Sequence, residues 1–132
     1  MQVLNFYSTI FADELKRGRK TATIRLGDKS GKYRKNQLVL VTIGYQHSPR
    51  ERIFEAVIDQ VEVMALADLS PRDIKHDNPE FRRHDELINF LEQIYGREVS
   101  TQDTVTVVRF SQILENPSGM TAAMKGFGGA QN

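Results

Sequence analysis

The sequence contains no cysteine and no long apolar run, and both absences limit what the protein can be. Without cysteine, disulfide bonds and thiolate metal sites are excluded, and we expect a cytoplasmic location. No stretch approaches the 18 consecutive apolar residues of a membrane span, so we expect no membrane partner. The first six residues are too few and too polar for a secretory signal.

The chain of 132 residues, 39% of them hydrophobic, has enough apolar material for one core. We therefore predict a single domain over residues 1–115 and a monomer. From residue 116 onward the sequence is small, polar and rich in glycine, which predicts a flexible tail over 116–132.

The positive charge is concentrated in one segment although the net charge is only +1. Nine of the 18 Lys and Arg residues lie between Lys16 and Lys35, where Asp28 is the single acid. Such a concentration predicts a surface for an anion, most often nucleic acid or a phosphorylated ligand. The expected phosphate contacts are Lys16, Arg17, Lys29, Lys32, Arg34 and Lys35.

Hydrophobic periodicity predicts mostly strands with helices inserted between them. Alternation predicts strands at 3–7, 21–26, 38–43, 52–64 and 103–110. A short helix is expected over 11–17, a brief one from Pro71, and a long one that begins at Asn78-Pro79-Glu80 and ends at Gly96. The fold class is α+β: a small β-barrel of about five or six mostly antiparallel strands, with helices around a cleft.

The octamer GRKTATIR, from Gly18 to Arg25, is the most informative segment. In an extended strand Thr21, Thr23 and Arg25 project from one face, and Lys20 lies at its start. Arg25 suits a phosphate, which it can bind with two parallel hydrogen bonds. The alternative is an ordinary hairpin strand whose threonines reflect β-propensity.

The segment from Asp13 to Gly44 resembles the opening of an ASCH domain, a member of the PUA-like superfamily. In that family a helix ending in a G-x-K element leads into a strand ending in Arg, here Gly18, Lys20 and Arg25. A weaker similarity continues through 69–96 to the strand Thr104–Phe110. The resemblance implies a small β-barrel with a cleft and a connection to RNA.

One ASCH branch comprises small bacterial amidohydrolases that remove the acetyl group from N(4)-acetylcytidine. The G-R-K-T-x-T-I-R pattern puts Lys20 and Thr23 in two of that branch's catalytic roles. The K-H-x-x-x-E pattern puts Glu80 in the third. We expect no cofactor and no metal. This chain is longer than the compact members of the branch, around residues 45–52 and after 113.

The physical chemistry of this trio is consistent with amide hydrolysis. Threonine needs a neighbouring base, and lysine supplies one only if its pKa falls, which burial and nearby cations favour. Lys16, Arg19 and Arg25 are the expected cations. Because Lys20 and Thr23 would face opposite sides of a regular strand, Lys20 must lie outside it, at the turn made by Gly18. Further substrate contacts are expected from Arg19, Thr21, Arg25, Tyr45 and His76.

Two further interpretations concern the tyrosine and histidine residues. Tyr33 and Tyr45 are candidates to stack on an exposed base. His76, Glu80 and His84 have i, i+4, i+8 spacing, but Pro79 favours a helix that starts after His76, so we expect no metal site.

Two functions follow from the sequence. The first is an enzyme that deacetylates N(4)-acetylcytidine or a related modified nucleoside with Lys20, Thr23 and Glu80. The second is a non-catalytic RNA-binding module, or a ribonuclease, that uses the same basic cleft.

Overall fold

The computed structural model describes residues 1–7, 11–44, 49–78 and 81–114, and these form one curled five-stranded sheet with helices beside it. The strands are β1 (Gln2–Phe6), β2 (Ala22–Leu26), β3 (Leu38–Ile43), β4 (Glu51–Ala65) and β5 (Thr104–Gln112). The helices are α1 (Ala12–Lys16), the 3-10 turn η2 (Leu66–Asp68), α2 (Pro71–Asp77) and α3 (His84–Tyr95). The predicted α+β class is confirmed, and each predicted strand is present to within about two residues.

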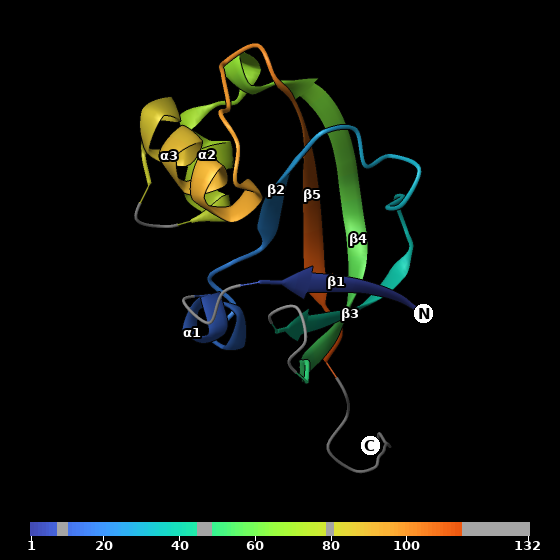
Figure 1. Cartoon of the computed structure of the whole chain (residues 1–132). Coiled ribbons are helices and arrows are strands. Elements are labelled where there is room, and N and C mark those ends of the chain that lie inside the picture. Colours follow the sequence, from blue (N-terminus) through green and yellow to red (C-terminus); the bar gives the residue numbers. More distant parts are fainter. Residues whose placement is uncertain (8–10, 45–48, 79–80, 115–132) are drawn as a thin grey trace, which may run out of the picture.

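The sheet has the order β1-β3-β4-β5-β2 and is mixed. β1 pairs with β3 in parallel, whereas the other three pairings are antiparallel. The first part of the 15-residue β4 pairs with β3 and the rest with β5. β1 and β3 cross the direction of β4 and β5 steeply (Figure 1), so the sheet curls into a half-barrel.

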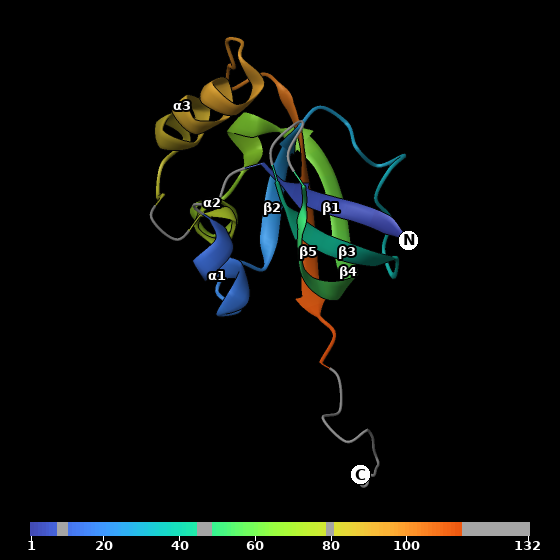
Figure 2. The ribbon, with the colours of Figure 1, turned by 60° about the horizontal axis from the view of Figure 1, so that its bottom comes forward.

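All three α-helices lie on one side of this half-barrel, in both ribbon views (Figures 1 and 2). Two apolar clusters result. One joins α1 and β1 to β3 and includes Leu4, Phe6, Phe11, Leu15 and Val41. The other joins α2 and α3 to β2 and includes Ile24, Ile74, Leu87, Leu91 and Val107.

Local sequence fixes both ends of α2. The Ser70 hydroxyl accepts a hydrogen bond from the Asp73 amide (3.1 Å), and the Asp73 carboxylate accepts one from the Ser70 amide (3.2 Å). This capping box, with Pro71 at the first helical position, starts the helix. Asn78 is extended (φ −144°, ψ 112°) because the residue before a proline avoids helical backbone, and α2 ends there.

The predicted start of the long helix at Asn78-Pro79-Glu80 is wrong. Asn78 ends α2, residues 81–83 are not helical, and α3 begins at His84. The Glu86 carboxylate accepts hydrogen bonds from the Arg82 and Arg83 amides at 2.9 and 3.1 Å, which satisfies amides at the start of α3. The C-terminal prediction is confirmed, since Gly96 ends α3 with a positive φ of 68°.

Within the described part of the chain, no helix has the length and apolar character needed to cross a membrane. The predicted tail over 116–132 lies outside the described residues.

Candidate functional site

Two cavities lie near Lys20, which lines the wider one and is linked to the smaller one through Asp77. The wide cleft has a volume of about 830 Å³ and lies between α2, β4 and β5; its lining includes Lys20, Thr21, Arg72, Asp73, His76 and Arg109. The small pocket, about 30 Å³, lies between β1, β2 and α3; its lining includes Phe6, Phe11, Thr23, Arg25 and Asp77. Lys20 lines the wide cleft, while its amine bonds Asp77 of the small pocket.

Lys20 is fully buried and held by three oxygen atoms. Its Nζ donates to the Ala22 carbonyl (2.9 Å), to the Asp77 carbonyl, and to the Asp77 carboxylate Oδ1 (3.0 Å). Its side chain has 0% exposure and that of Asp77 has 5%. The Phe11 and Phe6 rings lie 4.5 and 5.2 Å from Nζ. This is a desolvated amine in a specific polar and aromatic environment.

Lys20 lies before β2, as the sequence analysis required. Gly18 adopts a positive φ of 73°, and the Arg19 and Lys20 amides both donate to the Glu14 carbonyl, at 2.8 and 3.1 Å. β2 starts only at Ala22. The long Lys20 side chain therefore does not follow the strand alternation, and its amine reaches Asp77 and the Phe6 and Phe11 rings.

The environment lowers the pKa of Lys20 below its ordinary value near 10.5. Burial is the main cause, because it disfavours the charged ammonium. The Asp77 carboxylate raises the pKa of Lys20 through charge and hydrogen bonding, and the Arg25 guanidinium lowers it. Of the expected neighbouring cations only Arg25 contributes, since Arg19 pairs with Glu14 (2.8 Å) and Lys16 with Glu51 (3.1 Å).

Thr23 and Arg25 project from the same face of β2, as predicted from alternation, whereas Thr21, predicted on that face too, lies before the strand and lines the wide cleft. The Thr23 hydroxyl oxygen accepts a hydrogen bond from Arg25 Nε at 2.9 Å. This face of β2 is not exposed to solvent at Thr23, whose exposed fraction is only 4%. The Arg25 guanidinium carbon lies 4.9 Å from the centre of the Phe6 ring, and its buried Nη2 has no hydrogen-bond partner among the described residues.

Asp77 is the functional candidate that the sequence analysis missed. Its Oδ1 accepts hydrogen bonds from Lys20 Nζ and from the Ile24 amide (2.9 Å). It thus ties the end of α2 both to β2 and to the buried lysine. The only sequence signal was its place beside His76 in the K-H-x-x-x-E pattern, and nothing there indicated burial.

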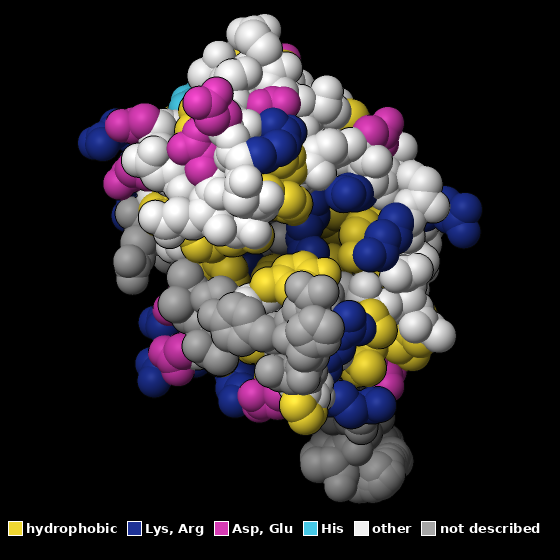
Figure 3. Space-filling view, viewed as in Figure 1, with side chains coloured by type: hydrophobic (Ala, Val, Ile, Leu, Met, Phe, Trp, Pro, Cys, Tyr) yellow, Lys and Arg dark blue, Asp and Glu magenta, His cyan; other side chains and the backbone are white. Residues whose placement is uncertain are grey.

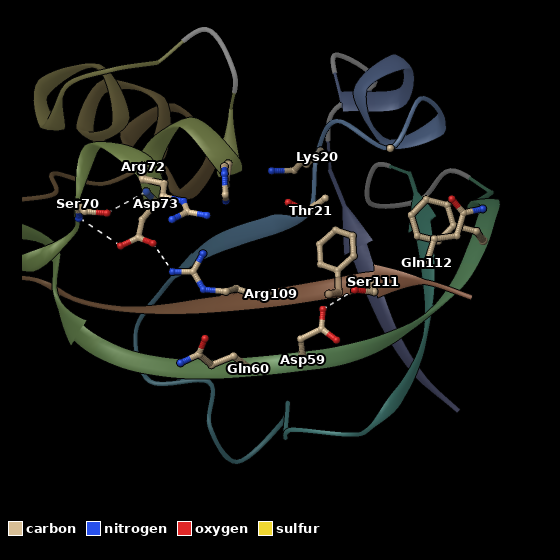
Figure 4. Close-up of a pocket in the computed structure, with 14 residues that line it drawn as sticks. Lys20, Thr21, Asp59, Gln60, Ser70, Arg72, Asp73, Arg109, Ser111 and Gln112 are labelled. Atoms are coloured by element: carbon tan, nitrogen blue, oxygen red, sulfur yellow. Dashed lines mark hydrogen bonds and ion pairs between the residues drawn. The ribbon is translucent and has the colours of Figure 1, made fainter. Parts of the chain in front are cut away.

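In the wide cleft, Thr21 and His76 are the predicted substrate contacts that the structure brings together (Figure 4). Asp73 in α2 forms an ion pair with Arg109 in β5. Burial raises the pKa of Asp73, but hydrogen bonds from Arg109 and Ser70 outweigh it, so the pKa lies below its usual value of 3.8. Asp73 therefore stays ionised and clamps α2 onto the sheet.

The basic residues outside β2 form two groups: one lies at the α1 end of β2, and the other lies in the connection that leaves the other end of β2 and runs across to β3 (Figure 1). At the α1 end, acids neutralise the predicted phosphate contacts: Arg17 pairs with Asp13 (3.1 Å), as Lys16 does with Glu51. At the other end, no ion pair within the described residues involves Lys29, Lys32, Arg34 or Lys35. Lys and Arg side chains, together with hydrophobic ones, border a hollow on the face shown in Figure 3.

Three other predictions have different outcomes. Tyr33 is not a stacking platform, because it is 2% exposed in the core and its hydroxyl donates to the Val3 carbonyl (3.2 Å). Glu80 and Tyr45 lie outside the described residues, so their roles stay predictions.

The histidine spacing does not produce a shared helix face. His76, expected before the helix, lies inside α2, whereas His84 starts α3 and its ring Nε2 lies 2.9 Å from the Leu69 carbonyl. Within the described ranges, no group of three or more potential ligands forms a metal cluster.

Comparison with known proteins supports the fold. No protein-family model and no curated protein matches the sequence. Among solved structures, an ASCH domain from Lactobacillus crispatus JV V101 matches with a TM-score of 0.60 at 16% identity, over 84% of this chain and 79% of its own. The DUF984 protein EF3133 from Enterococcus faecalis V583 matches with a TM-score of 0.62 at 15% identity, over 85% and 79%. The hypothetical protein PH0355 matches with a TM-score of 0.61 at 13% identity, over 86% and 100%.

These similarities establish an ASCH-like α+β half-barrel fold. At such identities they say nothing about activity, and the amidohydrolase branch stays a prediction.

Proposed function

We propose that the protein is an amidohydrolase that removes the acetyl group from N(4)-acetylcytidine or a related modified nucleoside. The observation that carries the proposal is the buried Lys20, whose pKa is lowered by burial and by Arg25. A lysine acts as a general base only after losing its proton, and this environment brings that loss closer to neutral pH.

Thr23 is the proposed nucleophile. Its oxygen attacks the acetyl carbonyl carbon while the neutral Lys20 amine takes the hydroxyl proton. When the C–N bond breaks, the Lys20 ammonium returns a proton to the exocyclic nitrogen and cytidine leaves. Water then hydrolyses the acetyl ester on Thr23, which releases acetate and restores the hydroxyl. Glu80 keeps its predicted role of orienting the substrate or passing a proton.

Two features of the Arg25 guanidinium support these roles. Arg25 Nε donates to the Thr23 oxygen, and hydrogen bonding of this kind stabilises an alkoxide as the proton leaves. Arg25 Nη2, buried and without a partner in the described residues, is a donor suited to the oxyanion of the tetrahedral intermediate. Lys20 must release at least one of its three oxygen contacts to reach the hydroxyl.

The test is chromatographic detection of cytidine and acetate after incubation with N(4)-acetylcytidine. Release by the wild type, abolished in Thr23→Val, is the expected result. The matched control is Thr104→Val, which changes an exposed threonine on β5 away from both cavities. Absence of release by the wild type, or equal rates in Thr23→Val, would contradict the proposal.

A second candidate, RNA binding without turnover, is favoured by one observation. Lys32, Arg34 and Lys35 form an exposed group without ion pairs in the described residues, beyond the end of β2. RNA affinity that falls steeply with salt, in the absence of cytidine release, would support this function instead.

A further inference from the structure

The small pocket is too small to hold a nucleoside. Its volume of about 30 Å³ is far below the roughly 300–1,000 Å³ of small-molecule sites, so a whole nucleoside does not fit there without rearrangement. The wide cleft, about 830 Å³, lies within the range of small-molecule sites, and Lys20 is part of its wall. The rest of a substrate whose acyl group meets Lys20 therefore has room in the wide cleft.

Cations predominate on one side of the wide cleft. The α2–β5 side carries Arg72, His76 and Arg109 with one acid, Asp73, which is paired with Arg109, whereas the β4 side carries Asp59 and Gln60 (Figure 4). Asp59 lies at a bulge, where the β4–β5 register shifts between Ile58 and Gln60. Its carboxylate accepts a hydrogen bond from the Ser111 hydroxyl at 2.6 Å. A ligand bound across this cleft therefore places its anionic group toward α2.

Arg72 is the available cation on that side. Arg109 is already paired with Asp73 and lies 3.8 Å from Glu62, so much of its charge is compensated. Arg72 is exposed and has no ion pair among the described residues. His76, four residues later on α2, lies on the same helix face and also lines the cleft. Guanidinium groups bind phosphate with paired hydrogen bonds.

We propose that the wide cleft binds a phosphate of the substrate through Arg72, beside Arg109 and His76, so that the enzyme acts on a phosphorylated N(4)-acetylcytidine in preference to the free nucleoside. This inference rests on the proposed function. The phosphate belongs to a free nucleotide or to an RNA strand, since both present the same anionic oxygens to Arg72.

The experiment compares kcat/KM for N(4)-acetylcytidine, its 5′-monophosphate and a short RNA containing the modified base. The 5′-monophosphate or the RNA is expected to be the better substrate. Arg72→Gln should lower kcat/KM for that phosphorylated substrate by about 10- to 100-fold, the range for losing a charged hydrogen-bonded pair, and should lower kcat/KM for the free nucleoside much less. Arg52→Gln is the matched control, because Arg52 is an exposed arginine on β4 outside the cleft.

Binding of cytidine 5′-monophosphate and cytidine, measured by calorimetry, separates this inference from the hydrolase itself. Arg72-dependent preference for the monophosphate supports the phosphate site even if no substrate is turned over, which would refute only the proposed function. Turnover with equal preference for all three substrates, or an Arg72→Gln effect no larger than that of Arg52→Gln, overturns the phosphate site while the hydrolase stands. Far-UV circular dichroism melting checks that both variants fold.

Discussion

Replacing Lys20 by methionine is expected to destabilise the protein strongly, because it leaves the Asp77 carboxylate buried without its countercharge. The two side chains are 0% and 5% exposed, and the ion pair is 3.0 Å long. Removing one partner of such a pair costs about 3–5 kcal/mol of unfolding free energy. With about 2.1 cal/mol/K of melting entropy per residue over 132 residues, Tm should fall by about 11–18 °C.

The double variant Lys20→Met/Asp77→Asn isolates the electrostatic cause. The second substitution keeps a side-chain oxygen for the Ile24 amide but removes the unpaired charge, so the double variant should recover about 2 kcal/mol or more relative to Lys20→Met. Urea unfolding followed by circular dichroism measures both values. Lys16→Met is the matched control, because its pair with Glu51 is more than half exposed and should contribute less than about 1 kcal/mol.

The pH dependence of the unfolding free energy gives an independent check on the burial of Lys20. The folded protein holds the Lys20 proton less tightly than the unfolded chain, so unfolding takes up a proton between the lowered pKa and 10.5. In that window wild-type stability should rise with pH relative to Lys20→Met. A difference that stays flat, or a Lys20→Met cost below about 1 kcal/mol, would refute the view of Lys20 as a buried, paired amine.

Three further predictions follow. Thr23→Val should leave Tm within a few degrees of the wild type while abolishing deacetylation; a surviving rate would assign the nucleophile elsewhere. The lowered pKa of Asp73 means that its stabilising contribution is present above 3.8 and is lost as pH falls through the folded value, so Arg109→Gln should show a smaller loss of stability between pH 6 and pH 3 in urea titrations. An unchanged slope would contradict the clamp between α2 and β5. If RNA binds along the β2–β3 connection, changing its four basic residues to glutamine should reduce the slope of log K against log salt by about 3–4. An unchanged slope would exclude this surface; the residues are Lys29, Lys32, Arg34 and Lys35.

Much of the fold could be predicted because its signals are local. The β3 strand at 38–43 is an almost uninterrupted apolar run, and Gly18 and Gly96 end helices through their own backbone freedom. The position of Lys20 outside the strand was predicted on the same local basis. The start of α3 was not, because Asn78-Pro79-Glu80 carries a helix-start pattern while the Ser70 capping box already begins a helix that Pro79 ends.

The candidate site was predicted less completely because its partners are distant in sequence. Lys20 and Asp77 are 57 residues apart, and no periodicity shows that an acid on α2 meets a lysine before β2. For the basic segment the error was different: its phosphate-binding role was predicted without counting the acids that lie close to it in the sequence. Asp13 and Glu14 lie within one helical turn or so of Arg17 and Arg19, and their neutralising effect could have been read from the spacing.

The most direct test of the proposed hydrolase is a single-turnover incubation with N(4)-acetylcytidine and its 5′-monophosphate, with cytidine or its nucleotide and acetate quantified together. Asp77→Asn, which retains Lys20, and Lys20→Met/Asp77→Asn, which lacks it, form a pair with the same second substitution. Equimolar release of both products by the wild type and by Asp77→Asn, and none by the double variant, is the predicted result. No release by the wild type, or the same rate in the double variant, would contradict a catalytic role for the buried amine.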